Sequence, residues 1–362
     1  MTSQSVHFLL VQILIINRHH LLLLATLALT GCADLKTSAP KPAAATAAAV
    51  LRPLETVGTI DRLDPALDAL IPPGAKLEKL AEGFIWAEGP VWMGTHLLFT
   101  DVPTNAIFKW EEGQGVTQFR RPSGYTGSTP RAGEPGANGL TRDLQGRLVL
   151  CQHGDRMVSR LEANGKTTPL AEFYRGRRFN SPNDLVFKSN GDLYFTDPPY
   201  GLVGNMADPL KEHPFQGVYR VKPDGTVTLL TEDLSRPNGL AFSPDERTLY
   251  VANSDPQRAI WNSYPVKPDG TLGEGRLFFD ATEHAKTMKG LPDGLKLDAS
   301  GNLFATGPGG VLIFSPAGKH LGTINTGEPT ANCAWGNDGS TLYVTVNHWL
   351  CRIKTTTRGR LP

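Results

Sequence analysis

The stretch that decides the fold begins at residue 236, reads RPNGLAFSPD over residues 236–245 and continues as LYVANS over residues 249–254. It consists of a loop, a short apolar run, a turn and a second apolar run. Related stretches recur: SPNDLVF (181–187) with LYFTD (193–197), LPDGLKL (291–297) with LFAT (303–306), and GANGLT (136–141) with LVLCQ (148–152). Two weaker copies are AEGPVW (87–92) with LLFTD (97–101), and ANCAW (331–335) with LYVT (342–345). A degenerate repeat of roughly 40–55 residues is typical of a solenoid or a propeller.

Each repeat has room for four strands. Turn sequences such as SNGD (189–192) and DASG (298–301) separate the first and second strands, and ANG (163–165) or PDG (223–225) separates the third and fourth. Asn-Gly and Asp-Gly turns are strong hairpin signals. Six such units predict an all-β fold, a six-bladed β-propeller with four antiparallel strands per blade. The last repeat ends near residue 354, so we expect residues 77–84 to supply its missing strand and close the ring.

The composition excludes some classes of partner. The formal net charge is +1, and no basic cluster points to nucleic acid. The repeats run without a break from residue 88, so residues 57–362 are expected to form one propeller domain.

The N-terminus has the features of an export signal. Basic residues 18–20 precede the apolar run 21–29, which ends in Leu29-Thr30-Gly31-Cys32. This order is typical of a signal peptide rather than a membrane span. The last four residues resemble a bacterial lipobox, so residues 1–31 are interpreted as a lipoprotein signal, Cys32 as the lipidated residue and residues 32–56 as a flexible tether. The expected location is the periplasm, with the lipid as the only link to a membrane. A plain signal peptide and an uncleaved anchor are the alternatives.

Three cysteines remain after Cys32, namely Cys151, Cys333 and Cys351. Their number allows at most one disulfide within the chain, and Cys333 and Cys351 fall on non-adjacent strands of one repeat. Buried free thiols are the expectation, and the spacing does not resemble a zinc site.

The residues that begin the first strand of each repeat share one chemistry. In a propeller these innermost strands start on one face around the axis, so we expect their leading side chains to meet in one mouth. Every one is a carboxylate or a carboxamide: Glu88, Asn138, Asn183, Asn238, Asp293 and Asn332. The alternative is that Asn-Gly and Asp-Gly merely form turns here. Glu88, which is not a turn former, argues against that alternative.

A second ring is expected at the ends of the second strands, where the chain returns to the mouth. Its members are Asp101, His153, Asp197, Asn253, Gly307 and His348. Four longer connections, 120–136, 174–182, 198–216 and 280–292, are predicted to surround the same mouth. Arg156 lies on or beside these connections and could hold an anionic product, unless it is simply solvated surface; Tyr200 is a further possible substrate contact.

Oxygen ligands from Glu, Asn and Asp suit a hard cation. The first ring lacks thiolates and does not require imidazole, so Ca²⁺ is favoured over Zn²⁺. One divalent cation with an open side for substrate is therefore predicted at the mouth.

Four ordered motifs resemble the gluconolactonase/senescence-marker-protein (regucalcin) family. They are EGPVW (88–92), PND (182–184), PNGL (237–240) and PDG (292–294). The resemblance implies a six-bladed propeller with one divalent metal, usually Ca²⁺ and sometimes Zn²⁺ or Mg²⁺. It implies Glu88, Asn238 and Asp293 as ligands, Asn183 as a ligand or substrate contact, and lactone hydrolysis with Asp293 as proton acceptor. Vertebrate members carry a substrate-binding Arg where Ser181 stands, so sugar specificity does not transfer.

The resulting hypothesis is metal-dependent hydrolysis of a sugar lactone such as gluconolactone. The metal would polarise the lactone carbonyl, and a carboxylate would activate water. Asp293 is the preferred base and His153 the alternative; Asn138, Asn183, Arg156 and Tyr200 are the candidate substrate contacts. Phosphotriester hydrolysis at the same metal site and a non-catalytic binding propeller are the alternatives.

Overall fold

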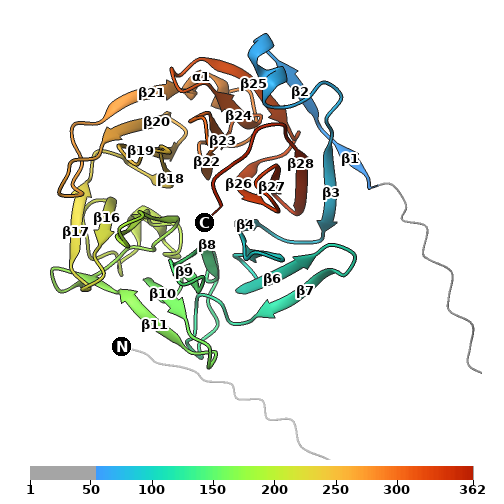
Figure 1. The fold of residues 1–362 in the computed structure, drawn as a ribbon. Helices are drawn as coiled ribbons and strands as arrows, with labels where there is room; N and C mark the ends of the chain where they lie inside the picture. Colours follow the sequence, from blue (N-terminus) through green and yellow to red (C-terminus); the bar gives the residue numbers. More distant parts are fainter. Residues whose placement is uncertain (1–53, 362) are drawn as a thin grey trace, which may run out of the picture. The chain divides into compact units, whose positions relative to one another are not determined.

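The computed structural model describes residues 54–361, and these residues form a ring of six antiparallel β-sheets around a central axis (Figure 1). We name the sheets blades 1 to 6 in chain order. The predicted signal peptide, Cys32 and almost all of the predicted tether lie outside the described residues. No helix within residues 54–361 is long and apolar enough to span a membrane.

The first three blades are regular four-stranded sheets. Blade 1 contains β4 (Ala87–Trp92), β5 (Leu97–Asp101), β6 (Ala106–Glu111) and β7 (Gly115–Arg120). Blade 2 contains β8 (Ala137–Arg142), β9 (Leu148–Gln152), β10 (Met157–Leu161) and β11 (Thr167–Ala171). Blade 3 contains β14 (Leu185–Phe187), β15 (Leu193–Asp197), β16 (Gly217–Val221) and β17 (Val227–Thr231). Between blades 2 and 3, β12 (Phe173–Tyr174) and β13 (Arg177–Arg178) form a small hairpin.

The other three blades continue the ring. Blade 4 contains β18 (Pro237–Phe242), β19 (Thr248–Asp255), β20 (Arg258–Pro265) and β21 (Arg276–Asp280). Blade 5 contains β22 (Leu295–Leu297), β23 (Leu303–Gly307), β24 (Gly310–Phe314) and β25 (His320–Asn325). Blade 6 contains β26 (Thr330–Gly336), β27 (Thr341–Val346), β28 (Trp349–Lys354) and β3 (Leu77–Glu82). Helical segments are short: η1 (Pro65–Ala69), η2 (Asn205–Ala207) and α1 (Thr282–Ala285).

The ring closes as predicted. Strand β3, from the N-terminal part of the propeller, pairs with β28, so one blade combines both ends of the repeat array. The sequence did not indicate two further strands. β1 (Thr56–Val57) extends blade 6 and β2 (Thr59–Arg62) extends blade 5, so these two sheets have five strands. Thr56, expected to end the tether, already pairs with Glu78.

Apolar side chains are buried between neighbouring blades rather than on the axis. Between blades 5 and 6, the rings of Phe304 and Trp335 meet edge to face with centroids 4.9 Å apart. Between blades 4 and 5, Trp261 packs against Phe314 with centroids 5.8 Å apart. This leaves the axis to the inner strands, which pack in the cyclic order β4, β8, β14, β18, β22, β26 and back to β4.

The three cysteines within the propeller are free and buried, as expected. Cys333 on β26 and Cys351 on β28 are separated by β27, where Val344 pairs with both of them. Burial raises the pKa of each thiol. These cysteines therefore behave as small apolar core residues.

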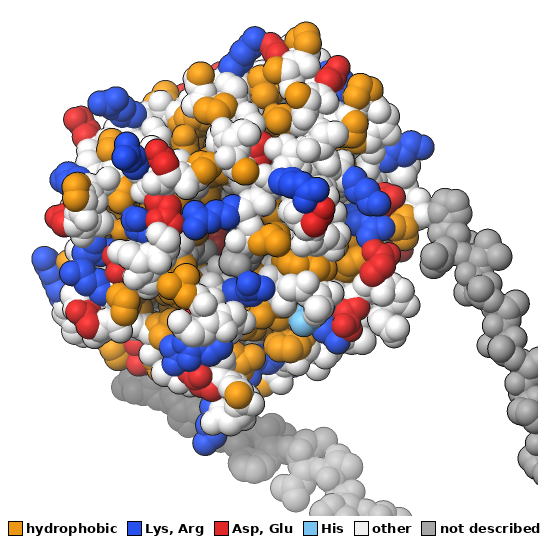
Figure 2. Space-filling view, viewed as in Figure 1, with side chains coloured by type: hydrophobic (Ala, Val, Ile, Leu, Met, Phe, Trp, Pro, Cys, Tyr) orange, Lys and Arg blue, Asp and Glu red, His pale blue; other side chains and the backbone are white. Residues whose placement is uncertain are grey.

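The two ends of the axis differ. We call the end where the inner strands begin the entrance end, and the end where they finish the tail end. The C-terminal segment 355–361 crosses the tail end, where Arg360 and Leu361 line a cavity formed by the ends of the inner strands. Charged side chains of both signs are scattered over the face shown in Figure 2, in keeping with the small net charge.

Candidate metal centre and substrate cavity

A cavity of about 170 Å³ opens at the entrance end of the axis. We call it the entrance cavity. Five of the six residues predicted to form the first ring line it, one from each of blades 1 to 5. The full lining is Trp86, Glu88, Glu134, Asn138, Asn183, Tyr200, Arg236, Asn238, Ser254, Leu291 and Asp293. The fold thus brings together residues that lie about two hundred positions apart in the sequence. They occur once per repeat, as a repeat of roughly 40–55 residues predicts.

The first-ring residues lie in strands or at their starts, not in turns. The ladder of several inner strands is irregular at the ring position: between Glu88 and Val91 in β4, and between Ala137 and Leu140 in β8. The same holds between Pro237 and Leu240 in β18. Bulges redirect a side chain and occur often beside active sites. The alternative that Asn-Gly and Asp-Gly only form turns is therefore wrong for this set.

Glycines that follow the ring residues allow the inner strands to approach one another. A Cβ on Gly294 would lie 2.0 Å from Cγ of Asn332, and a Cβ on Gly139 would lie 2.8 Å from Cα of Asp184. In their place, the Gly139 N–H donates to the carbonyl of Asn183 at 2.7 Å. The Asn-Gly and Asp-Gly pattern thus combines a polar side chain in the cavity with backbone contact between blades.

The oxygens in the entrance cavity lack partners within the protein. Oδ1 of Asn138, Asn183 and Asn238 and Oδ1 of Asp293 are buried without a hydrogen bond. Buried polar atoms are nearly always satisfied, so four orphaned acceptors in one cavity require a partner from outside the chain. Within residues 54–361, no three His, Cys, Asp or Glu side chains cluster as a cation site. The donor set is two carboxylates with amide oxygens, which fits Ca²⁺.

The carboxylates of the cavity repel one another. Burial, with the charge of Asp184, raises the pKa of Glu88 to about 8. Burial, with the charges of Glu88 and Asp184, raises the pKa of Asp293 well above its usual range. A divalent cation between these groups would stabilise both ionised forms and reverse the shifts.

Asp184 was not predicted, yet it belongs to the same cluster. It is buried beside the inner strands, and its Oδ2 accepts from Nδ2 of Asn332 at 3.3 Å. That amide nitrogen also donates to Oε2 of Glu88 at 3.1 Å. Asn332 is therefore a bridge between two carboxylates and is not a lining residue of the cavity, contrary to its predicted place in the first ring. The sequence did contain one indication of this role: Asp184 stands where the neighbouring copies of the repeat have Gly.

His153 lies behind Asn183 and is fully buried, outside the cavity lining. Its Nε2 is 3.4 Å from Nδ2 of Asn183, and its Nδ1 is 3.4 Å from Oε2 of Glu134. Because an amide NH₂ only donates, Nε2 must accept and Nδ1 carries the hydrogen, which finds no hydrogen-bond partner within residues 54–361. This contact turns the Asn183 nitrogen toward His153 and leaves its oxygen for the cavity.

The remaining predicted substrate contacts have different positions. Tyr200 lines the cavity, and its hydroxyl donates to the Ser254 carbonyl at 3.2 Å. Burial raises the pKa of Tyr200. Arg156 is not among the lining residues. Its Nε donates to the Phe179 carbonyl at 2.6 Å, and its Nη1 lies 3.3 Å from Glu212. Loop contacts thus occupy the guanidinium that was expected at the mouth.

The predicted second ring has another role. Asp197 accepts hydrogen bonds of 2.8 Å from the N–H groups of both Asn180 and Ser181. In the same way Asp101 accepts from the Trp86 N–H at 2.9 Å, and Asn253 from the Arg236 N–H at 2.7 Å. These side chains hold the backbone two or three residues before the first-ring residue of their own blade. The expectation that they line the mouth is wrong for these three, because their polar groups satisfy backbone donors instead.

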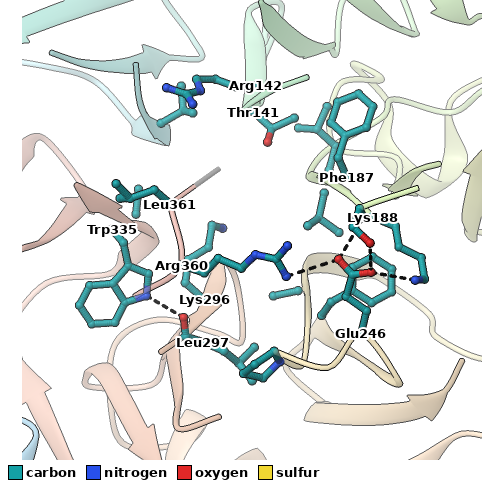
Figure 3. Close-up of a pocket in the computed structure, with 18 of the residues that line it drawn as sticks. Thr141, Arg142, Phe187, Lys188, Glu246, Lys296, Leu297, Trp335, Arg360 and Leu361 are labelled. Atoms are coloured by element: carbon teal, nitrogen blue, oxygen red, sulfur yellow. Dashed lines mark hydrogen bonds and ion pairs between the residues drawn. The ribbon is translucent and has the colours of Figure 1, made fainter. Parts of the chain in front are cut away.

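A second cavity of about 310 Å³ lies at the tail end (Figure 3). Its walls are mostly apolar, and Arg360 and Leu361 of the C-terminal segment help to line it. Arg360 reaches Glu246, which also binds Lys188 at 2.8 Å (Figure 3). None of the predicted site residues lines this cavity, so its larger volume does not make it the candidate metal centre.

Fold and site together define a six-bladed propeller with one carboxylate-and-amide cavity on its axis. Residues 86–348 match the model of the SMP-30/Gluconolactonase/LRE-like region, and the chain belongs to this family. It is 40% identical over 318 residues to a gluconolactonase of Zymomonas mobilis, which covers 84% of this chain and 88% of that protein. The family assignment made from the four motifs is confirmed.

Solved structures agree with the fold. The gluconolactonase of Xanthomonas campestris superposes with a TM-score of 0.72 at 31% identity, covering 84% of this chain and 99% of that one. A calcium-binding regucalcin of Agrobacterium tumefaciens gives a TM-score of 0.62 over 78% of this chain and 95% of that one. At 21% identity, this second likeness supports the fold alone.

Proposed function

We propose that the chain hydrolyses a sugar lactone of the gluconolactone type in the entrance cavity, with one divalent cation bound there. The observation that carries this proposal is the group of four buried oxygens without partners beside Glu88. The similarity to gluconolactonases supplies the substrate class.

Glu88, Asn183, Asn238 and Asp293 are the proposed ligands, and Ca²⁺ is the proposed ion because the donors are carboxylate and amide oxygens. Zn²⁺ and Mg²⁺ are the other candidates. A cation bound there supplies Lewis acidity toward the lactone carbonyl oxygen. Asn138 also lines this cavity with a free Oδ1, and we propose it as a substrate contact.

Asp293 is the proposed proton acceptor for the attacking water. Its Oδ1 faces the cavity without a hydrogen bond, so it can reach a water molecule there. In the cation-free protein, burial and neighbouring carboxylates raise the pKa of Asp293; a bound cation opposes this shift, so the carboxylate is ionised and can accept the proton. His153 is a weaker candidate because Asn183 separates it from the cavity. Tyr200, whose hydroxyl donates a hydrogen bond to the Ser254 carbonyl, is proposed to line the substrate site.

The test is hydrolysis of glucono-δ-lactone, followed by proton release and corrected for the spontaneous reaction. Protein stripped with chelator is assayed alone and with Ca²⁺, Mg²⁺, Mn²⁺ or Zn²⁺. The proposal requires low activity in stripped protein and recovery with at least one ion. Activity that is unaffected by complete removal of metal would exclude the cation. A protein that binds an ion but accelerates neither lactone nor phosphotriester hydrolysis would be a binding module.

We also propose that the protein is exported and held at a membrane in the periplasm by a lipid on Cys32. The support is the lipobox-like sequence Leu29-Thr30-Gly31-Cys32, which lies outside the described residues. Mass spectrometry of the mature N-terminus tests this. An unacylated mature chain, with unchanged fractionation of Cys32→Ser, would contradict the proposal.

A further inference from the structure

The rim of the entrance cavity has a donor side and an acceptor side. Arg236 and Ser254 come from blade 4, whereas Glu134 comes from the connection between β7 and β8. Glu134 lies three residues before β8, the inner strand of blade 2, and blade 3 separates blade 2 from blade 4 (Figure 1). A ligand in the cavity therefore meets hydrogen-bond donors from blade 4 and a carboxylate beside blade 2.

Arg236 is the only cationic side chain among the lining residues of this cavity. Its backbone is fixed on both sides: its N–H donates to Oδ1 of Asn253 at 2.7 Å, and its carbonyl accepts from the Ser254 N–H at 2.9 Å. No hydrogen bond or ion pair holds its guanidinium within the described residues. A guanidinium on a fixed backbone that lines the cavity, and whose donors have no partner within the described residues, is prepared to bind oxygen atoms of a ligand.

Glu134 is partly exposed on the connection that leads into β8. One of its oxygens, Oε2, lies 3.4 Å from Nδ1 of His153. His153 Nδ1 makes no hydrogen bond within residues 54–361, so Glu134 is near the imidazole but is not held by it. The second oxygen of Glu134 remains available to accept hydrogen bonds from a ligand.

We propose that Arg236 and Glu134 are specificity-determining residues that select lactones carrying several hydroxyl groups. Arg236 donates to hydroxyl oxygens on one edge of the lactone, and Glu134 accepts from hydroxyl hydrogens on the other. The inference rests on the proposed lactone hydrolysis and deepens it by assigning the residues that recognise the sugar. The neighbouring walls, Trp86 and Leu291, offer apolar surface to the face of the ring.

Arg236 and Glu134 can discriminate between lactones because a lactone without hydroxyl groups leaves their hydrogen-bonding groups without partners. A lactone without hydroxyls would displace water from Arg236 and Glu134 but could not replace the hydrogen bonds that the water made with these side chains. Sites built to bind a hydroxyl reject the analogue that lacks it far more strongly than apolar pockets reject a missing methylene. The pair therefore favours a polyhydroxylated lactone over an unsubstituted one of the same ring size.

The test compares glucono-δ-lactone with δ-valerolactone, which has the same six-membered ring and no hydroxyls. Arg236→Leu and Glu134→Gln should each lower kcat/KM for glucono-δ-lactone by about 10- to 100-fold, mainly through KM. Both variants should change kcat/KM for δ-valerolactone by less than about threefold, and Arg236→Lys should restore part of the loss. Arg276→Leu and Glu274→Gln, exposed positions on or beside β21, are the matched controls and should change neither reaction.

Binding of gluconate, measured by calorimetry, gives a readout independent of turnover and should weaken in Arg236→Leu. Equal losses for both lactones would overturn the inference, because Arg236 would then act on the reaction or on the ion. Unchanged kinetics for glucono-δ-lactone would also overturn it. If the wild-type protein hydrolyses neither lactone but binds gluconate through Arg236, lactone hydrolysis fails while the recognition pair stands. Absence of both hydrolysis and gluconate binding overturns both.

Discussion

Nδ2 of Asn332 lies 3.3 Å from Oδ2 of Asp184, and the same nitrogen is 3.1 Å from Oε2 of Glu88. One amide group from blade 6 thus connects carboxylates of blades 3 and 1 beneath the entrance cavity. Without this amide, the buried carboxylates of Glu88 and Asp184 would lose a shared hydrogen-bond donor. The bridge therefore links ring closure to the orientation of a proposed cation ligand.

Asn332→Leu should weaken both the fold and the ion site. The substitution keeps the approximate shape but leaves two buried carboxylates without this donor, which costs on the order of 2–3 kcal/mol. Thermal unfolding should therefore occur at lower temperature, and titration with Ca²⁺ should show lower affinity. Asn302→Leu is the matched control, since Nδ2 of Asn302 donates to Asp298 at 2.7 Å on the tail side. It should destabilise without changing Ca²⁺ affinity. Equal Ca²⁺ affinity in both variants would show that the bridge does not orient Glu88.

Cation affinity should rise with pH up to about pH 8. In the cation-free protein the pKa of Glu88 is raised to about 8, mainly by burial, so a proton must leave before an ion binds. Below that pH, affinity should fall by about tenfold per pH unit for each proton displaced. Calorimetry in two buffers of different ionisation enthalpy measures the protons released. Affinity that is flat between pH 6 and pH 8 would contradict the raised pKa.

The stability of the cation-free protein should fall as pH rises, whereas its cation affinity rises. Glu88 binds its proton more tightly in the folded than in the unfolded state. Its contribution to stability is therefore full below its usual pKa of 4.5 and is lost as pH rises to about 8. Urea unfolding at several pH values should show a smaller decline in Glu88→Gln, which cannot ionise. An identical decline in both proteins would assign the effect to other groups.

The sequence was sufficient to predict the ring residues because a repeat fixes register. If each repeat contains four strands, Glu88 and Asp293 lie at equivalent positions at the start of inner strands, independently of the lengths of the connecting loops. Closure by β3 followed from the same count, because blade 6 lacked an outer strand. The short edge strands β1 and β2 were not predicted, since pairing at the outside of a blade needs few residues and has no repeat to mark it.

Side chains whose positions depend on loop paths or on contacts between blades could not be predicted in this way. Asp197 ends its strand as expected, but whether its carboxylate faces the mouth or the preceding loop depends on where residues 180–181 run. Arg156 is held by Phe179 and Glu212, which come from two separate loops. The contact between Asp184 and Asn332 joins two distant repeats, which the pattern within one repeat does not reveal.

Removal of the C-terminal segment should lower stability without affecting catalysis. Oγ1 of Thr357 donates to Asp298 at 2.7 Å, and Arg358 binds Asp338 at 2.7 Å, so the segment joins blades 5 and 6. Gly359 packs on Trp335 so closely that a Cβ there would lie 1.8 Å from the indole. Truncation after Thr356 should lower the melting temperature by several degrees, as loss of about 1–2 kcal/mol does in a domain of this size. Because the segment lies at the tail end, kcat/KM for glucono-δ-lactone should remain within about twofold; a larger loss would show coupling along the axis.

Asp293→Asn separates the role of ligand from the role of base. The amide keeps an oxygen of similar shape but loses the charge and the capacity to accept a proton. If Asp293 only holds the ion, excess Ca²⁺ should restore most of the rate, because the deficit is in affinity. If it is the base, saturating Ca²⁺ should leave kcat lower by about 10²–10⁴-fold, the usual contribution of general base catalysis. His153→Phe is the comparison, since it removes the acceptor that orients Asn183 and should lower Ca²⁺ affinity while saturating Ca²⁺ restores kcat. Full rescue of Asp293→Asn by Ca²⁺, together with a loss of kcat in His153→Phe that no Ca²⁺ concentration repairs, would transfer the role of base to His153.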